Sequence, residues 1–350
     1  DNLVVGFVPN PAVNCTPGAQ PKQFQLTLTP SSETNQAGDS HTVTATLTDL
    51  TAGGAPVAGA TIGFAVTGAN PGTGSGVTNG SGQATFTYTG TVVGGDTISA
   101  CYNADSSADG SCEAVASATK QWIFGAPANL DLTPATDTNP VDTQHCVTAR
   151  VTNQFGVPIP NITVRFSVAG SVTMTGSGTT NASGQATFCY TGPALPGADV
   201  ITAYADTNNS STQDAGEPSD TAAKTWVLPT STPGCKVTYG GRIEAANGDK
   251  ATFGGNAQVP PKGQEQYQDH GPAANLNVHS INVQAVTCSA DGTSASIFGQ
   301  ATVNGSGTFN YRIDLRDLGE PGSSDTYRIR LSSGYDSGEQ VLESGNVQIH

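Results

Sequence analysis

The chain has 350 residues, which is enough for two or three domains that each bury a core of their own. Its formal net charge of −15 argues against nucleic acid and anionic membrane surfaces as partners, because both require a positive field. Only 12% of the residues are charged and no apolar run approaches the length of a membrane span, so we expect no membrane insertion. Short alternating runs rich in Thr and Val, without helical periodicity, predict an all-β protein.

The ends and the cysteines of the chain indicate its compartment. The first residue is Asp1 and the single Met is Met174, which is typical of a processed chain whose signal peptide has been removed. Seven Cys without a CxxC pair favour disulfides in an oxidising compartment over a zinc site. The alternative is a cytosolic protein with buried free thiols. We therefore expect a secreted protein, either extracellular or on the cell surface.

The N-terminal extension, residues 1–22, begins with a run of strand-forming residues that prolines close off. The run consists of Leu3, Val4, Val5, Phe7 and Val8. Nothing later in the chain corresponds to this segment. It either adds a strand to its own first or last domain or completes a sheet in a neighbouring copy by strand addition.

One stretch of the chain occurs twice. Residues 78–90 read TNGSGQATFTYTG and residues 180–192 read TNASGQATFCYTG, with 11 of 13 positions identical. A repeat at a fixed spacing predicts two copies of one structural unit. Each copy contains turn residues followed by a half-buried strand, in which Ala, Phe and Tyr alternate with polar residues. His41 and His145 start equivalent strands, so a structural role is favoured for them over metal binding.

Further matches extend the repeat over two domains, 23–124 and 125–229. GAPV at 54–57 matches GVPI at 156–159, and the KQW motif of repeat one matches KTW in repeat two. Together with the opening LTP and the TNxxGxAxFxYTG stretch, these motifs resemble the bacterial immunoglobulin-like domain of the invasin and intimin type. The resemblance covers about residues 24–229. It implies tandem immunoglobulin-like β-sandwiches of ~100 residues, which are rigid spacers in surface adhesins and carry no catalytic residues.

The last domain, residues 230–350, contains further alternating strands separated by clusters of Gly, Pro, Ser and Asp. Its motifs YGGRI, FGG, YQDH and SGNVQIH resemble the small β-domain of the post-COAP type, which implies no activity. We expect a β-sandwich or a jelly roll here. Polar residues of this domain that could bind a metal are more typical of turns that face water, and they are Asp269, His270, His279, His350, Asp317, Glu320 and Asp325.

Six of the cysteines form three expected pairs, which are Cys101–Cys112, Cys146–Cys189 and Cys235–Cys288. In repeat one, Thr42 and Thr87 occupy the positions of Cys146 and Cys189. In an immunoglobulin-like sandwich we expect the two strands to be facing neighbours, which predicts a bridge across the sheets. The first pair flanks an acidic loop, and the third is the natural remaining pair.

Cys15 is left over, on the same N-terminal segment that has no counterpart in the repeat. An odd Cys in a secreted protein indicates pairing between molecules. A free or locally buried thiol is the alternative.

An acidic segment, residues 206–217, places oxygen-bearing side chains at positions 1, 3, 5, 9 and 12 of a twelve-residue loop. This is the ligand spacing of a calcium loop. The candidate ligands are Asp206, Asn208, Ser210, Asp214 and Glu217, and a structural Ca²⁺ is the one cofactor that we expect. Ser211 stands where calcium loops have Gly, and a plain solvated acidic loop is the alternative.

No GxSxG, HExxH or Gly-rich phosphate loop is present, so we expect no enzyme. The favoured hypothesis is a structural subunit of a bacterial surface filament, whose partners are copies of itself joined head to tail by N-terminal strand addition. The alternative is a monomeric adhesin or stalk fragment whose C-terminal domain binds a glycan or a host or matrix ligand. A third hypothesis, an accessory module of a secreted hydrolase, requires a catalytic domain that these residues do not contain.

Overall fold

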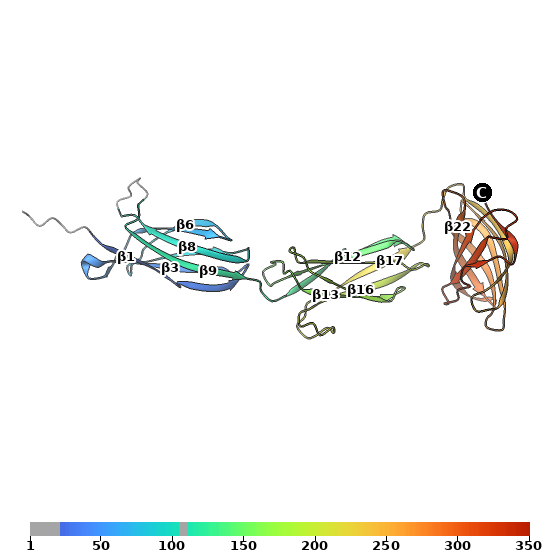
Figure 1. Cartoon of the computed structure of the whole chain (residues 1–350), viewed down its shortest axis with the longest axis horizontal. Coiled ribbons are helices and arrows are strands. Elements are labelled where there is room, and N and C mark those ends of the chain that lie inside the picture. The colour runs from blue at the N-terminus through green and yellow to red at the C-terminus, as the bar shows by residue number, and fades with distance from the viewer. Residues whose placement is uncertain (1–21, 105–110) are drawn as a thin grey trace, which may run out of the picture. The chain divides into compact units, whose positions relative to one another are not determined.

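The computed structural model describes residues 22–104 and 111–350, and the regular structure in them is almost entirely β (Figure 1). The one helical element in these residues is the short 3-10 helix η1 (Leu50–Ala52). The all-β prediction is thereby confirmed. The chain divides into two compact units. The first contains the residues up to Ala126 together with Asn153–Val157, and the second contains Pro127–Thr152 and Pro158–His350. The expected donor strand, residues 3–8, and Cys15 lie outside the described residues.

The first unit contains an immunoglobulin-like sandwich. Its strands are β1 (Phe24–Thr29), β2 (Ser32–Gln36), β3 (Ser40–Asp49), β4 (Ala55–Pro56), β5 (Thr61–Gly68), β6 (Gly72–Val77), β7 (Gln83–Thr89), β8 (Gly94–Tyr102) and β9 (Ala114–Ile123). One sheet joins β1, β4 and β7 to β3, and the other has the order β2-β9-β8-β5-β6. Alternate residues of both sheets, such as Leu47 and Ile62, form the shared core. Strand β2 pairs in parallel with β9, so the second strand of the domain lies beside its last.

The repeated stretch forms the predicted turn and strand. Asn79 Oδ1 accepts hydrogen bonds from the backbone N of Ser81 (2.9 Å) and of Gln83 (3.1 Å), and Gly82 has a φ of +73° that favours glycine. The final Gly90 has a packing reason, because a Cβ there would lie 2.2 Å from the Trp122 ring. The repeat therefore encodes both the turn and the space for a buried indole.

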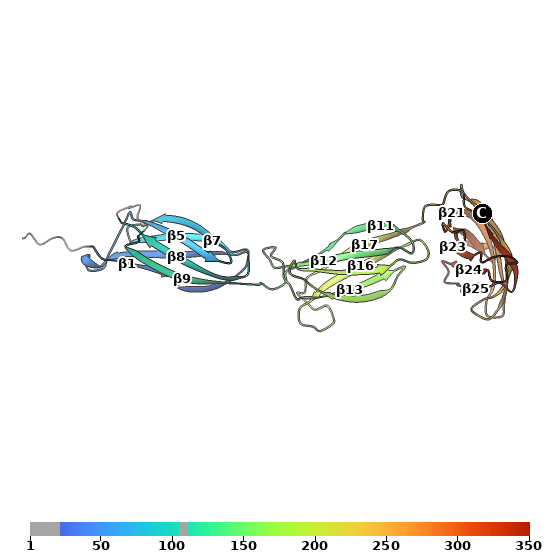
Figure 2. The same cartoon turned by 45° about the horizontal axis from the view of Figure 1, so that its top comes forward.

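The second sandwich has the same topology, except that it has no strand equivalent to β4. Its strands are β10 (Asn129–Thr133), β11 (Thr136–Pro140), β12 (Gln144–Thr152), β13 (Thr163–Gly170), β14 (Met174–Thr179), β15 (Gln185–Thr191), β16 (Gly197–Asp206) and β17 (Ser219–Val227). The sheets have the orders β10-β12-β15 and β11-β17-β16-β13-β14. Here β11 lies in parallel beside β17, as Figure 2 shows.

The C-terminal domain is one continuous antiparallel sheet. Its strands are β18 (Lys236–Glu244), β19 (Lys250–Gln258), β20 (Lys262–His270), β21 (Asn275–Cys288), β22 (Ser294–Val303), β23 (Ser306–Arg316), β24 (Thr326–Leu331), β25 (Gln340–Val341) and β26 (Ser344–Ile349). Each strand from β18 to β25 pairs with its neighbours in the chain, and β26 returns to pair with β18. The two ends of this strand order, β25 and β26, are consecutive in the chain but do not pair with each other, and the sheet curls around one apolar core. This meander order differs from the jelly roll that was one of the two expected forms, because short turns let each strand pair with the next.

Candidate functional site

A buried polar network occupies the same place in both immunoglobulin-like domains. In the first, the carboxylate of Asp96 on β8 accepts hydrogen bonds from Trp122 Nε1 on β9 (2.8 Å) and from the hydroxyl of Tyr88 on β7 (3.2 Å). The backbone N of Asn70 donates to it as well, at 2.8 Å. Burial, followed by the charge of Asp96, raises the pKa of Tyr88 to about 12. Because Tyr88 and Asp96 belong to different sheets, this network ties the sandwich together.

The second domain repeats the arrangement. Asp199 accepts hydrogen bonds from Trp226 Nε1 (2.7 Å), the hydroxyl of Tyr190 (3.1 Å) and the backbone N of Val172 (2.8 Å). Burial and the charge of Asp199 raise the pKa of Tyr190 above its usual range. Sequence comparison of the repeats had matched the tryptophans, but the buried aspartate was missed. Its signal was the sequence DTI at residues 96–98 of repeat one, which has DVI at the equivalent residues 199–201 of repeat two.

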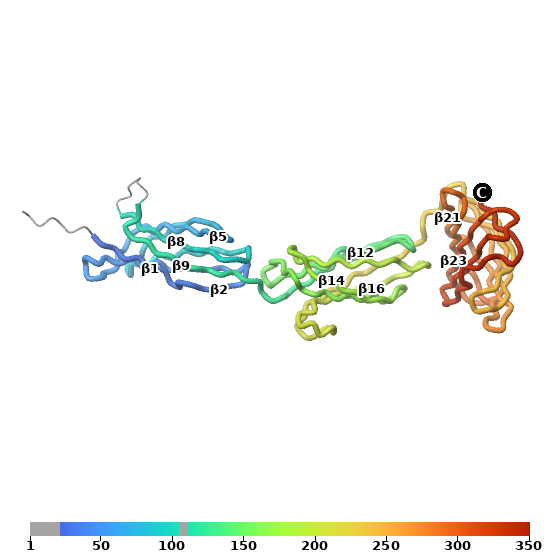
Figure 3. The backbone as a smooth tube through the Cα atoms, in the orientation of Figure 1, coloured from blue at the N-terminus to red at the C-terminus, as the bar shows by residue number. Residues whose placement is uncertain are grey.

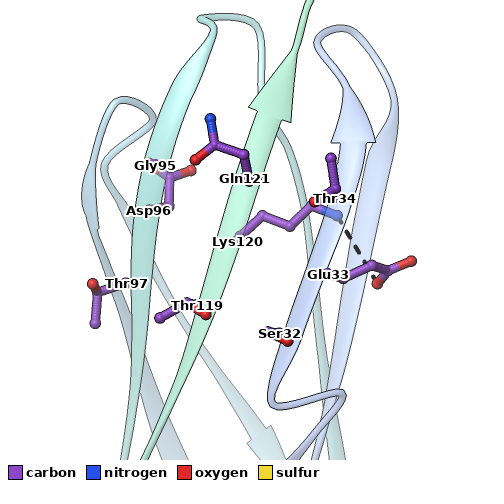
Figure 4. A pocket seen from close by; sticks show the side chains of 9 residues that line it. All are labelled: Ser32, Glu33, Thr34, Gly95, Asp96, Thr97, Thr119, Lys120 and Gln121. Atoms are coloured by element: carbon purple, nitrogen blue, oxygen red, sulfur yellow. Dashed lines mark ion pairs between the residues drawn. The ribbon is translucent and has the colours of Figure 1, made fainter.

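A buried lysine lies on the other side of each tryptophan. The Lys120 ammonium is 4.9 Å from the centroid of the Trp122 ring, and that of Lys224 is 4.7 Å from the Trp226 ring. Both side chains are fully buried. Figure 4 shows Lys120 reaching from β9 toward β2, where Glu33 Oε2 lies 3.9 Å from its Nζ. The same view shows the hollow over β2, β8 and β9 that these side chains line.

Each lysine site also contains one of the repeated histidines. His41 Nδ1 lies 2.9 Å from Glu33 Oε2, and His145 Nδ1 lies 3.1 Å from Asp137 Oδ2. Burial lowers the pKa of both imidazoles, and the neighbouring lysine adds to the effect. Both side chains are engaged inside their domains, which agrees with the structural role favoured from sequence.

The three expected disulfides are present, at Cys101–Cys112, Cys146–Cys189 and Cys235–Cys288. For one of them, the expected placement between the two sheets was wrong. Cys146 and Cys189 do not bridge the two sheets, because β12 and β15 are neighbours in one sheet and the two residues are directly opposite each other. Both are exposed on its outer face, with a Cα–Cα distance of 4.0 Å. In the first domain the equivalent Thr42 and Thr87 hydroxyls form a hydrogen bond of 2.7 Å.

The cross-strand bridge should contribute measurably to the second domain. We expect the double replacement C146T/C189T to lower its free energy of unfolding by about 2 to 4 kcal/mol, less the small gain from a threonine pair like Thr42–Thr87. Urea unfolding followed by Trp226 fluorescence measures this. The reverse exchange, T42C/T87C in the first domain, serves as the matched control and should be stabilising. An unchanged midpoint for C146T/C189T would contradict the expectation.

The acidic loop follows strand β16 in the chain (Figure 3). It is held by the protein's own donors. Asp206 Oδ2 lies 2.7 Å from Arg165 Nε, and the backbone N atoms of Ser210 and Ser211 donate to the same carboxylate. Asp214 Oδ2 accepts from the Asn208 amide (2.8 Å) and the Ser210 hydroxyl (2.7 Å). The candidate ligands therefore lie in one loop, but the oxygens that would bind Ca²⁺ accept hydrogen bonds from the protein.

The last candidate ligand, Glu217, accepts a hydrogen bond from the backbone N of Thr207 at 2.7 Å. Glu113 in the first domain does the same for the backbone N of Ala104, at 2.6 Å. Within the described ranges 22–104 and 111–350, no group of three or more His, Cys, Asp or Glu side chains is arranged to hold a metal. Calcium binding to this loop stays a prediction.

Removing the guanidinium tests how the acidic loop is held. In the R165A variant, the Asp206 carboxylate loses its partner, so we expect faster proteolysis within residues 206–217. If the calcium prediction is right, millimolar Ca²⁺ restores protection in R165A, whereas the D214A variant should not respond. Proteolysis of R165A at the wild-type rate would show that the ion pair does not hold the loop.

The polar residues considered in the C-terminal domain are not brought together. Asp269 accepts from the Tyr335 hydroxyl (2.7 Å), and His270 Nε2 contacts Thr252 Oγ1 (3.0 Å). Asp325 accepts from two backbone N atoms, and Glu320 from the side-chain amides of two residues. These groups support turns and strand ends.

The sequence interpretation missed Glu265, which is buried inside this domain. The Tyr327 hydroxyl donates to Glu265 Oε1 at 2.7 Å. Burial raises the pKa of Glu265 to about 8, although the neighbouring hydroxyls of Tyr239 and Tyr327 act in the opposite direction. A signal was present, because strict alternation along β20 places Glu265 on the same face as Tyr267 and Asp269.

These observations define an all-β protein with two immunoglobulin-like sandwiches and a C-terminal domain formed by one nine-stranded sheet. No helix among the described residues is long and apolar enough to cross a membrane. No family model matches the chain, and no curated protein matches it.

Solved structures similar to the chain include bacterial adhesins. The Escherichia coli adhesin FdeC is 16% identical over 94% of this chain and 98% of its own, with a TM-score of 0.33. Invasin, a bacterial integrin-binding protein, is 14% identical over 89% and 68%, with a TM-score of 0.37. The Yersinia pseudotuberculosis adhesin InvE is 20% identical over 66% of each chain, with a TM-score of 0.29. At these values the likenesses carry no argument about function.

Proposed function

We propose that the chain is a non-catalytic, extracellular structural protein with an adhesin-like role, in which the immunoglobulin-like domains serve as spacers. The observation that carries this proposal is the duplicated buried network around Asp96 and Asp199. In both domains the polar and titratable side chains of the core hold strands together, and each domain has its own disulfide. Such reinforcement suits a module that carries load.

We further propose that copies of the chain assemble head to tail into a surface filament by strand addition. In the described residues, the outer edges of β6 and β14 pair with no strand. Neither strand contains a charged residue or a proline, which are the residues that usually protect a sheet edge. Residues 3–8 of a neighbouring copy would supply the added strand, with Val4 and Phe7 setting its register and Cys15 available for a covalent link.

Deleting residues 1–15 tests the filament. Electron microscopy of the full chain should show filaments, and the truncated chain should give monomers. A C15S variant is the matched control, because it removes covalent multimers from a non-reducing gel while leaving strand addition intact. Proline substitutions T73P and T175P on the two edges identify the acceptor strand. Filaments that persist after the deletion would exclude this mode of assembly.

A second candidate function is ligand binding by the C-terminal domain. Two adjoining hollows on its outer face meet at Gly254 and Gln266. A Cβ on Gly254 would meet no atom within 4 Å, so the surface is open there. The lining side chains include Gln264, Gln268 and His279, which both donate and accept hydrogen bonds as glycan hydroxyls require.

Binding of the full chain to immobilised glycans and matrix proteins tests this alternative. A Q266A variant should lose binding, and K236A, on the neighbouring strand β18, should keep it. A compact monomer in solution scattering would accompany this function. No binding to either class of ligand would exclude it.

A further inference from the structure

We propose that Lys120 and Asn35 of the first immunoglobulin-like domain form an intramolecular amide bond. Lys120 Nζ lies 2.6 Å from Asn35 Oδ1. The two residues are on the parallel neighbours β9 and β2, and Asn35 is aligned with Trp122, two residues beyond the lysine. The bond would join the second strand of the domain to its last.

The surroundings of the lysine suit a nucleophilic amine. The side chain is fully buried, and the ring of Trp122 covers it at 4.9 Å. Burial lowers the pKa of Lys120, although the charges of Glu33 and Asp39 oppose the shift. A lower pKa increases the share of neutral amine, and the neutral amine is the form that can attack a carbonyl carbon.

The carboxamide of Asn35 is oriented for this attack. Its Nδ2 donates to the backbone O of Ser40 (3.2 Å) and lies 3.4 Å from Asp39 Oδ2. These bonds turn Oδ1 toward Lys120 and direct the nitrogen that would leave toward the exposed end of the strand. Fixing both groups in one geometry replaces a slow bimolecular reaction by an intramolecular one.

A carboxylate that can move protons is within reach. Glu33 Oε2 lies 3.9 Å from Lys120 Nζ and is held by His41 Nδ1 at 2.9 Å. The neutral Nζ attacks Cγ of Asn35, Glu33 takes a proton from Nζ, and the carboxamide nitrogen receives that proton. The Cγ–Nδ2 bond breaks, a Cγ–Nζ bond forms, and one ammonia leaves, so no oxidant or cofactor is required.

The second domain provides an internal comparison. Lys224 Nζ lies 2.7 Å from Asp137 Oδ2, and Asp137 occupies the position of Glu33. The hydrogen bond from Lys224 is the main reason that the pKa of Asp137 lies below its usual range. An ionised carboxylate resists attack by an amine, and Asn139, the counterpart of Asn35, instead donates to the backbone O of Gln144 at 3.4 Å. We expect this lysine to remain an ion pair.

Mass spectrometry of the full chain decides the question. The intact protein should be lighter than its sequence, corrected for three disulfides, by the mass of one ammonia. After reduction, cleavage after Glu33 and Glu113 separates Asn35 from Lys120, so the amide would keep peptides 34–113 and 114–244 joined. Separate peptides would overturn the proposal. This holds even if the mass of one ammonia is missing, because a succinimide at an Asn-Gly sequence also loses ammonia but does not join the two peptides.

Variants assign the bond to its residues. K120R and N35A should restore the full mass, and K224R in the second domain should keep the deficit. N35D should keep the full mass of its sequence, because an ionised carboxylate paired with Lys120 resists attack as Asp137 does beside Lys224. E33Q should slow the reaction, and the 44% exposure of the Glu33 side chain should let this variant keep the fold. A deficit that persists in K120R would also overturn the proposal. The wild-type peptide map decides even if a variant fails to fold.

Discussion

Replacing Asp199 by alanine is expected to destabilise the second immunoglobulin-like domain by roughly 3 to 6 kcal/mol, enough to unfold it under mild conditions. The substitution leaves three donors without an acceptor, namely the buried Trp226 Nε1, the buried Tyr190 hydroxyl and the half-buried backbone N of Val172. Each unsatisfied buried donor costs about 1 to 3 kcal/mol. Urea unfolding followed by tryptophan fluorescence measures the loss, because each immunoglobulin-like domain contains one of the two tryptophans.

Two variants control this measurement. D96A removes the same acceptor from the first domain and should affect that domain alone. D131A removes an exposed aspartate of the second domain and should change stability by less than about 0.5 kcal/mol. A D199A protein as stable as D131A would show that Asp199 does not hold the sandwich.

The C-terminal domain is expected to lose stability as the pH rises from about 4.5 to about 8. The pKa of Glu265 is about 8 in the folded chain, against an ordinary value of 4.5. Between these values the folded state binds more protons than the unfolded state, so the free energy of unfolding falls with rising pH. The slope approaches about 1.4 kcal/mol per pH unit for one group. Below pH 4.5 and above pH 8 this group contributes no further slope.

An E265Q variant should remove this pH dependence, because the amide keeps the shape of the neutral carboxyl without titrating. Calorimetry from pH 4 to pH 9 measures the midpoint of the C-terminal transition. The matched control is E244Q, since the Glu244 side chain is 58% exposed and should leave the slope unchanged. A slope of wild-type size in E265Q would mean that another group is responsible.

The sequence predicted the β-class, the repeated turn and strand, and the three cysteine pairs, because each depends on local periodicity or on matching two copies of one motif. It misplaced the Cys146–Cys189 bridge, since strand pairing connects residues that are 43 apart in the chain. Thr42 and Thr87 contained the missing information, because two threonines that hydrogen-bond on one face mark a cross-strand pair.

The polar networks were harder to predict for the same reason. Lys120 meets Asn35 across 85 residues, and Tyr327 meets Glu265 across 62. No local pattern relates such partners, and their pairing depends on which strands are neighbours. Alternation within a strand could show that Glu265 faces inward, but not which hydroxyl would contact it.

The pairing of the last strand, β26, with the first strand of the C-terminal sheet imposes an order on folding. The first strand, β18, finds one of its two neighbours only when β26 has arrived, about a hundred residues later in the chain. During synthesis or export from the N-terminus, both immunoglobulin-like domains can finish folding while β18 still has one edge unpaired. A chain halted at that stage would present this edge to other chains. Rapid pairing of residues 344–349 with β18 therefore protects the whole molecule from aggregation.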